Sequence, residues 1–148
     1  MVTPEWAFVA LGSNLGDREG HLSRARQGLA ALPRTTLVAV TAVEETEPIG
    51  PVRQDRFLNQ MVLIRTALTP YQLLRHCLAI ERAAGRVRGE RWGPRTLDLD
   101  IVRFGDRVLV RPDLVLPHPE LPNRPFWLRE VAELERAPRG LTAHERET

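Results

Sequence analysis

The order of its apolar patterns restricts this chain to few folds. Runs rich in Val, Ile, Leu and Thr predict strands, and apolar residues at spacings of three and four predict helices. The elements follow one another as strand, helix, strand, strand, helix, strand. They are expected at residues 6–11, 18–31, 35–43, 57–66, 70–84 and 97–104. This order predicts an α+β fold with a ferredoxin-like βαββαβ core, in which helices pack on one antiparallel sheet.

Turn and capping residues mark the boundaries of these elements. Residues 69–72, Thr-Pro-Tyr-Gln, match a capping box with proline at the first helical position, so they predict the start of the second helix. Residues 44–56 contain two prolines and a glycine and are expected to form a loop. Gly105-Asp106 predicts a hairpin turn from the last core strand into an extra strand at residues 107–110. A short C-terminal helix is expected near residues 126–134.

The chain is expected to be a single domain over residues 1–148, with a frayed polar tail at about 138–148. Its start lacks the basic and apolar segments of a signal peptide, and no apolar run approaches the roughly 20 residues that span a bilayer. Cys77 is the only cysteine in the sequence, which excludes an internal disulfide and a cysteine-rich zinc site. We therefore expect a cytoplasmic monomer without a membrane partner.

One predicted strand carries two carboxylates on the same face. In residues 97–101, Leu-Asp-Leu-Asp-Ile, alternation places Asp98 and Asp100 on one face and the aliphatic side chains on the other. Two neighbouring carboxylates repel each other, and a divalent cation removes that repulsion. Mg²⁺ binds one or two carboxylates together with substrate phosphates. The alternative is a solvated strand face paired with arginines, but the preceding loop favours a metal site.

That loop is rich in arginine and glycine. Its four arginines are Arg86, Arg88, Arg91 and Arg95. Guanidinium groups bind phosphate oxygens through two parallel hydrogen bonds, although many basic loops are simply solvated. All 21 basic residues of the chain are arginine, and the absence of lysine excludes a Walker-type phosphate loop and Schiff-base chemistry. Arginines beside a carboxylate pair indicate phosphoryl transfer.

Other residues leave two interpretations open. Phe57 and Asn59 share one face of a strand, where they could bind a planar heterocycle or form part of an ordinary core. Trp92 could anchor its loop or cover an aromatic substrate. Three residues of the proline-rich segment could bind phosphate or stack on a ring, or could be structural: His118, Arg124 and Phe126.

With these motifs in view, the chain resembles the 6-hydroxymethyl-7,8-dihydropterin pyrophosphokinase family. The resemblance extends from about Trp6 to Leu134, and its most specific part is Arg-Trp-Gly-Pro-Arg-Thr-Leu-Asp-Leu-Asp-Ile at residues 91–101. Shorter family motifs occur in the expected order: Gly12-Ser-Asn-Leu15, Phe57-Leu-Asn59, Gly85-Arg-Val-Arg88, Pro117-His118 and Asn123-Arg124. Glu47 stands where the family pattern has proline.

The resemblance implies an ATP-dependent diphosphotransferase of folate biosynthesis. ATP would give its β,γ-diphosphate to the pterin hydroxymethyl group and leave as AMP, with two Mg²⁺ ions at Asp98 and Asp100. The catalytic residues that it implies are Arg86, Arg95, Asp98 and Asp100. The implied ATP site comprises Glu81, Arg86, Arg88, Trp92, Arg95, Ile101, His118 and Arg124. The implied pterin pocket comprises Thr46, Ile49, Phe57, Asn59, Trp92, Asp98 and Phe126.

Two other functions match parts of the pattern. A ferredoxin-like RNA-binding module could use the basic loop, but it would need aromatic residues on its central strands. The formal net charge of +2 is also low for a nucleic-acid partner. A two-metal nucleotidyl transferase would release pyrophosphate, whereas a pyrophosphokinase would release AMP. We therefore expect small-molecule substrates, ATP and hydroxymethyldihydropterin, and no nucleic acid.

Overall fold

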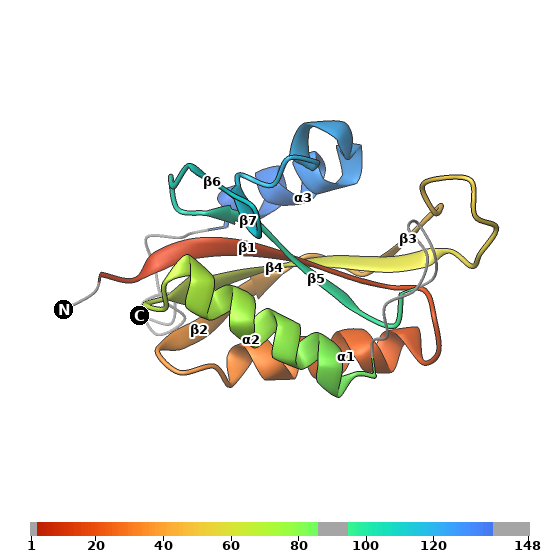
Figure 1. Ribbon diagram of the computed structural model, residues 1–148, viewed down its shortest axis with the longest axis horizontal. Helices are drawn as coiled ribbons and strands as arrows, with labels where there is room; N and C mark the ends of the chain where they lie inside the picture. Colours follow the sequence, from red (N-terminus) through yellow and green to blue (C-terminus); the bar gives the residue numbers. More distant parts are fainter. Residues whose placement is uncertain (1–2, 86–94, 138–148) are drawn as a thin grey trace.

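The computed structural model describes residues 3–85 and 95–137 of the chain. Its elements are β1 (Glu5–Ser13), α1 (Arg18–Ala30), β2 (Thr35–Val40), β3 (Glu44–Thr46), β4 (Phe57–Thr66), α2 (Pro70–Ala83), β5 (Asp98–Phe104), β6 (Leu109–Arg111), β7 (Leu114–Leu116), the 3₁₀ turn η1 (Leu121–Asn123) and α3 (Pro125–Glu135). Helices α1 and α2 cover one face of the sheet, and α3 lies on the other face (Figure 1). The α+β class, the βαββαβ order and the C-terminal helix are therefore confirmed.

The main sheet has the strand order β2–β4–β1–β5, and every pair along it is antiparallel. Strand β1 is central and pairs with β4 over its full length, from Glu5 opposite Thr66 to Ser13 opposite Leu58. On its other side it pairs with β5, with a bulge between Phe8 and Val9. This order brings the end of β1 between the start of β4 and the start of β5.

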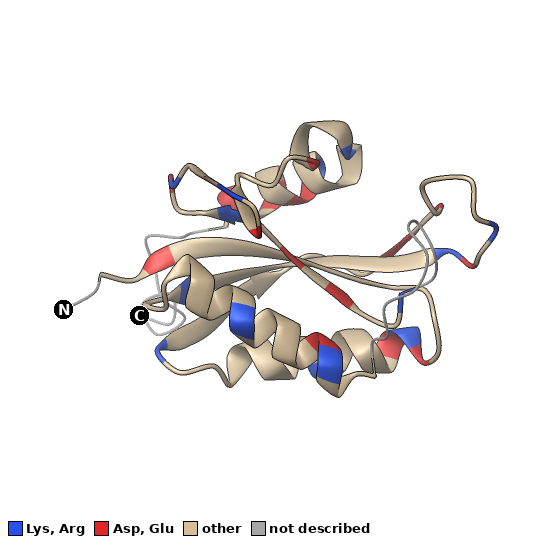
Figure 2. Cartoon of the chain, viewed as in Figure 1, with Lys and Arg blue, Asp and Glu red and all other residues tan. Residues whose placement is uncertain are grey.

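Each face of the sheet has its own apolar cluster, because side chains alternate along a strand. Val9 and Leu29 belong to the cluster beneath α1 and α2, whereas Phe8, Met61 and Val131 belong to the cluster beneath α3. Burial on both faces explains why β1 has an uninterrupted apolar sequence. Charged residues fall mostly on helices and loops, and acidic bands also occur within strands, including β5 (Figure 2).

Helix capping follows the sequence prediction. The Thr69 hydroxyl accepts the N–H of Gln72 at 3.1 Å, and the Thr69 N–H donates to the Gln72 side chain at 2.9 Å. This reciprocal capping box starts α2 at Pro70. Gly85 follows the helix with a φ of 84°, a conformation that glycine adopts without strain. Within the described ranges, no helix is both long and apolar enough to cross a membrane.

The extra hairpin is confirmed, but two details of the loops differ from the expectation. Residues 44–46, expected in a loop, form β3 and pair with the start of β4. The chain turns at Gly105, but the following strand does not pair with β5. Instead, β6 and β7 form a separate two-stranded sheet. The turn is held against β1, because the Gly105 N–H donates to the carbonyl of Trp6 at 2.6 Å and Arg107 pairs with Glu5 at 2.8 Å.

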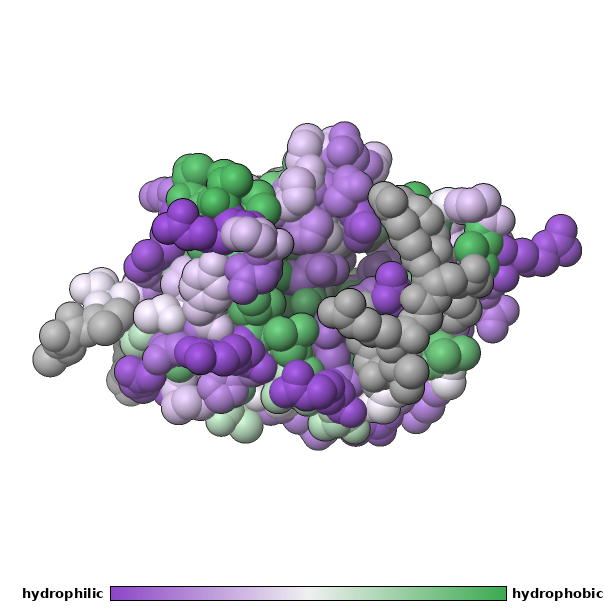
Figure 3. Space-filling model, in the orientation of Figure 1, coloured by the Kyte–Doolittle hydropathy of each residue, from purple (hydrophilic) through white to green (hydrophobic). Residues whose placement is uncertain are grey.

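The β6–β7 hairpin carries exposed apolar side chains. Val108 is 79% exposed and Val110 is 74% exposed. The space-filling view shows an apolar area in the region of β6 (Figure 3).

Candidate functional site

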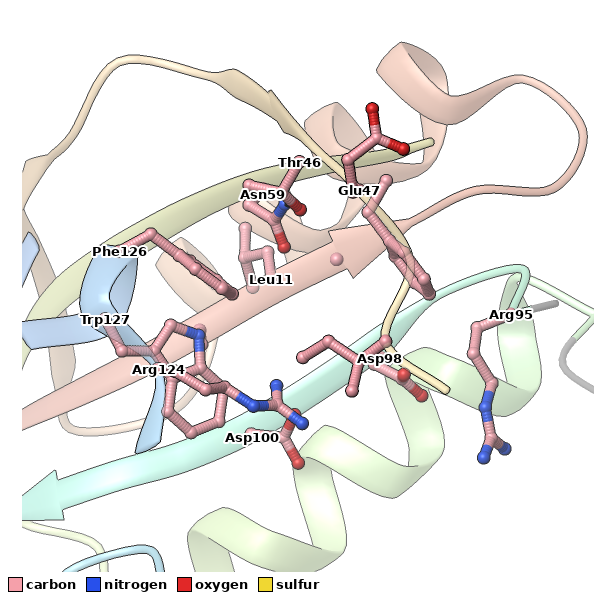
Figure 4. Close-up of a pocket in the computed structure, with 14 residues that line it drawn as sticks. Leu11, Thr46, Glu47, Asn59, Arg95, Asp98, Asp100, Arg124, Phe126 and Trp127 are labelled. Atoms are coloured by element: carbon pink, nitrogen blue, oxygen red, sulfur yellow. Dashed lines mark hydrogen bonds between the residues drawn. The ribbon is translucent and has the colours of Figure 1, made fainter. Parts of the chain in front are cut away.

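A pocket opens on the α3 side of the sheet, where β1 ends and β4 and β5 begin. Its lining residues come from all three strands, from β3 and the segment after it, and from the start of α3. They are Ala10, Leu11, Gly12, Thr46, Glu47, Ile49, Phe57, Asn59, Arg95, Asp98, Asp100, Arg124, Phe126 and Trp127 (Figure 4). The pocket therefore joins segments that are far apart in the sequence.

Strand β5 contributes both carboxylates to the pocket. Asp98 and Asp100 line it, whereas Leu99 and Ile101 are buried in the core on the opposite face. The alternation predicted from the sequence is thus observed. Two hard oxygen donors at the edge of an open pocket suit Mg²⁺, because that ion completes its coordination with water and substrate phosphates. Among the described residues, no group of three or more His, Cys, Asp or Glu could hold a metal ion by itself.

A glycine separates the acidic and amide sides of the pocket. In the strand register, Gly12 lies between Asn59 of β4 and Asp98 of β5. A Cβ atom at Gly12 would stand 3.5 Å from Asn59 Oδ1 and 3.7 Å from Phe57 Cδ1. An alanine would therefore fit, but it would fill the space above the sheet at this point. The glycine keeps that space open for a ligand.

Aromatic and amide groups form one wall of the pocket. Asn59 is 8% exposed and donates through Nδ2 to the hydroxyl of Thr46, which fixes the orientation of the amide. Phe57 and Phe126 line the pocket from opposite elements, β4 and α3. An oriented amide beside two aromatic rings is suited to a planar heterocycle, since rings stack and amides bind ring edges.

Basic and aromatic side chains meet at the start of α3. The guanidinium of Arg124 lies 4.3 Å from the centre of the Trp127 ring. The His118 ring meets the same tryptophan edge-on, with ring centres 5.0 Å apart. His118 Nε2 lies 3.7 Å from Asp100 Oδ1. The side chain of Arg124 extends over β5 toward Asp100 (Figure 4). A guanidinium and an imidazole therefore lie beside the carboxylate pair.

Asn14 joins three segments that surround the pocket. Its Nδ2 donates to the Gln54 side chain at 2.7 Å and to the carbonyl of Asp55 at 2.9 Å. Its Oδ1 accepts the N–H of Arg95 at 2.7 Å, and its own N–H donates to the Arg95 carbonyl at 3.0 Å. The residue is 2% exposed, so these bonds are protected from water. They couple the segment after β1 to the segments that precede β4 and β5.

The structure brings together most of the described residues that the sequence singled out. Those that line the pocket are Thr46, Ile49, Phe57, Asn59, Arg95, Asp98, Asp100, Arg124 and Phe126. His118 contacts Asp100 from beside the pocket. Glu81 is buried on α2, where its carboxylate accepts the N–H of Leu99 at 2.8 Å. Ile101 lies in the core on the far face. Arg86, Arg88 and Trp92 lie outside the described residues.

Five lining residues were not singled out as site residues from the sequence: Ala10, Leu11, Gly12, Glu47 and Trp127. Trp127 is 2% exposed, and a tryptophan in an amphipathic helix ordinarily indicates core packing. Glu47 pairs with Arg56 at 2.8 Å, a contact across the segment between β3 and β4 that no sequence spacing reveals. The only signal for Glu47 was its departure from the family's proline.

Comparison with known proteins identifies the family. The protein-family model described as 7,8-dihydro-6-hydroxymethylpterin-pyrophosphokinase (HPPK) matches residues 8–136 of the chain. The chain belongs to the HPPK family. It is a pyrophosphokinase that transfers a pyrophosphoryl group to hydroxymethyldihydropterin in folate biosynthesis. Enzymes of this family generally use ATP with Mg²⁺.

Individual relatives carry the same name, 2-amino-4-hydroxy-6-hydroxymethyldihydropteridine pyrophosphokinase. The Bacillus subtilis protein is 43% identical over 128 residues, which cover 86% of this chain and 77% of the relative. The Pseudomonas aeruginosa protein is 45% identical over 127 residues, covering 86% and 78%. The Methylorubrum extorquens protein is 45% identical over 128 residues, covering 86% and 81%.

The RNA-binding alternative does not agree with the fold or with the family. An RNA-binding sheet of this type exposes aromatic residues on its central strands. Here α3 packs on that face, and Phe8, Met61 and Leu63 beneath it are fully buried.

Proposed function

We propose that this enzyme transfers the β,γ-diphosphate of ATP to the hydroxymethyl group of 6-hydroxymethyl-7,8-dihydropterin and releases AMP. In this proposal it acts as a single-domain cytoplasmic monomer with two Mg²⁺ ions at Asp98 and Asp100. The observation that carries the proposal is that the carboxylate pair and the aromatic–amide wall share one pocket. A reacting hydroxyl and a polyphosphate therefore have adjacent places to bind.

The pterin is proposed to bind on the Asn59 side. Its ring stacks between Phe57 and Phe126, and the oriented Asn59 amide binds the heterocycle edge. Two further residues of the pocket complete the proposed pterin site: Thr46 and Ile49. The space above Gly12 supports this placement, since a flat ring needs close access to the sheet. Trp92, outside the described residues, is proposed to cover the bound ring and the ATP.

The phosphates of ATP are proposed to bind on the other side, among Arg95, Arg124 and His118. The position of Arg124 over β5 supports this role, because guanidinium groups bind phosphate oxygens bidentately. Arg86 and Arg88 are proposed to bind the same phosphates. Glu81 and Ile101 are proposed to lie near the nucleoside, as the resemblance implies, although both side chains are buried outside the pocket lining.

In the proposed reaction the hydroxymethyl oxygen attacks the β-phosphorus, the bond from that phosphorus to the AMP oxygen breaks, and the alcohol proton is released to solvent. Bound Mg²⁺ supplies neutralisation of the phosphate charge. Asp98 adjoins both the pterin wall and Asp100. It is therefore proposed to bind both the pterin and the metal, and so to fix their relative positions. Arg86 and Arg95 are proposed to stabilise charge on the transferred group. Catalysis of this type consists of positioning and electrostatic stabilisation.

The proposal is tested by incubating the protein with ATP, Mg²⁺ and the pterin and measuring AMP. Asp98→Asn and Asp100→Asn are expected to reduce turnover by about a hundredfold or more while folding normally. Asp106→Asn is the matched control, since it removes the same charge from an exposed turn. Release of pyrophosphate in place of AMP would instead identify a nucleotidyl transferase. Near-normal turnover in both variants would exclude the metal role.

A further inference from the structure

The buried face of α3 carries one carboxyl group among apolar side chains. Glu130 is 3% exposed, and its neighbours Val131 and Leu134 belong to the apolar cluster beneath the helix. A buried carboxyl is unfavourable when it is charged and unpaired. Its presence here therefore calls for a specific explanation.

Glu130 bonds to Thr41, which lies between β2 and β3 at the sheet edge. Its Oε2 accepts the hydroxyl of Thr41 at 3.0 Å. The same hydroxyl oxygen accepts the N–H of Met61 at 2.9 Å. The Glu130 carboxyl is the nearer acceptor for its single proton, since the Met61 carbonyl lies 3.5 Å away. Glu130 Oε1 is buried and has no hydrogen-bond partner in the described part of the chain.

Thr41 is held against the sheet by further hydrogen bonds. Its N–H donates to the carbonyl of Met61 at 2.9 Å, and its carbonyl accepts the side chain of Gln60 at 2.7 Å. Gln60 in turn accepts the guanidinium of Arg26 on α1 at 2.6 Å. The Glu130–Thr41 bond therefore attaches α3 to a rigid part of β4 and, through it, to the helix on the opposite face.

The attachment point lies one turn from the pocket. Phe126 and Trp127 precede Glu130 by four and three residues, which places all three on the same face of α3. Both aromatic residues line the pocket (Figure 4). A shift of α3 at Glu130 would therefore move this wall of the site.

A second contact connects α3 to the facing wall. Arg129 pairs with Glu44 at the start of β3, and β3 ends at Thr46, which lines the pocket. Arg129 and Glu44 are largely exposed, so their pair is screened by solvent. The buried bond from Glu130 to Thr41 is thus the stronger constraint on this side.

We propose that Glu130 is a positioning residue for the pterin site, whose bond to Thr41 sets the placement of α3 and therefore of Phe126 and Trp127. This inference rests on the proposed location of the pterin site, and it does not depend on the reaction that takes place there.

The neutral carboxylic acid is the form that suits this place. Burial raises the pKa of Glu130 to about 7, and the bond from Thr41 only partly opposes that rise. The charged groups that act on it are Glu44 of β3 and, from α3 itself, Glu133 and Arg129. Because two acidic residues and one basic residue act on Glu130, their combined effect further disfavours ionisation of its carboxyl. When pH rises past neutral, the carboxyl gains a charge that its buried site does not compensate, and α3 becomes less firmly attached.

The test compares wild type with Glu130→Gln, which mimics the neutral acid at every pH, and with Glu19→Gln, which removes a charge from the exposed side of α1 and is not among the groups that act on Glu130. The Michaelis constant for the pterin and kcat are measured from about pH 6 to about pH 8.5. Wild type and Glu19→Gln are expected to lose pterin affinity over this range by roughly three- to tenfold relative to Glu130→Gln, with much smaller changes in kcat. Identical pH profiles for wild type and Glu130→Gln would overturn the proposal.

A second measurement does not depend on catalysis. Hydrogen exchange of the α3 amides, corrected for intrinsic rates and measured without substrate, is expected to accelerate with pH in wild type but not in Glu130→Gln. Thr41→Val removes the hydroxyl and is expected to accelerate exchange in α3 at every pH, whereas Thr41→Ser is expected to preserve protection. Failure of the proposed function would leave all variants without AMP formation, and this exchange pattern would still be observed. Unaltered α3 exchange in Thr41→Val would contradict the positioning role.

Discussion

His118 points its Nε2 atom at Asp100 Oδ1 across 3.7 Å. The other ring nitrogen, Nδ1, accepts the N–H of Glu120 at 3.0 Å. A neutral imidazole has one donor and one acceptor nitrogen, so this backbone contact assigns the proton to Nε2. His118 therefore presents a donor to the edge of the site, beside one of the two carboxylates.

Replacement of His118 by asparagine tests the two contacts separately, because it keeps one and removes the other. Asparagine retains an acceptor near the Nδ1 position for the Glu120 N–H, but it does not reach Asp100. We expect the Michaelis constant for ATP to rise about tenfold, equivalent to about 1.4 kcal/mol, with little change in melting temperature. Steady-state kinetics and thermal unfolding of the same preparation measure both effects. Unchanged kinetics would show that the ring serves only the turn at Glu120.

Asn14→Asp tests the coupling of the three segments around the pocket. The substitution keeps an oxygen for the N–H of Arg95 but removes the donor to Gln54 and Asp55. It also buries a charge at a residue that is 2% exposed. We expect the free energy of unfolding to fall by about 2 kcal/mol, measured by urea denaturation. Asn123→Asp, on an exposed 3₁₀ turn, should cost far less. A similar loss in both variants would argue against a special role for Asn14.

The fold could be predicted from the sequence because its signals are local. Apolar patterns, the capping box at Thr69 and the order of the elements together were sufficient to predict the core arrangement. The two differences involve long-range contacts. Residues 44–46 form a strand along the edge of β4, and the chain after β5 turns toward the start of β1, where Arg107 pairs with Glu5, 102 residues away.

The site could be predicted only where chemistry and spacing coincide. The alternation of Asp98 and Asp100 identified one side of the pocket, and the resemblance supplied most of the rest. Trp127 and Glu130 carry no such signal. Their environment depends on how α3 packs on the sheet, and a helix pattern indicates a buried face without indicating what that face meets.

Gly12→Ala tests whether the space above β1 is a ligand site. The added methyl group would make ordinary contacts with Asn59 and Phe57, at 3.5 and 3.7 Å, and alanine is favoured over glycine within a strand. We therefore expect unchanged or slightly increased stability. The Michaelis constant for the pterin should rise about tenfold or more, because the methyl group occupies the space of the ring. The Michaelis constant for ATP serves as the internal control. Normal pterin kinetics in this variant would place the ring elsewhere.

Stability should depend on pH through Glu130. Burial raises the pKa of this carboxyl from 4.5 to about 7, so the folded state binds its proton more tightly than the unfolded state. A raised folded-state pKa contributes stability that is complete below the unfolded pKa of 4.5 and is lost as pH rises through about 7. The difference corresponds to about 3 kcal/mol. Urea unfolding across this range should show wild type losing up to that amount relative to Glu130→Gln, whose side chain does not titrate. Parallel curves for the two proteins would mean that the carboxyl is ionised, or solvated, in the native state.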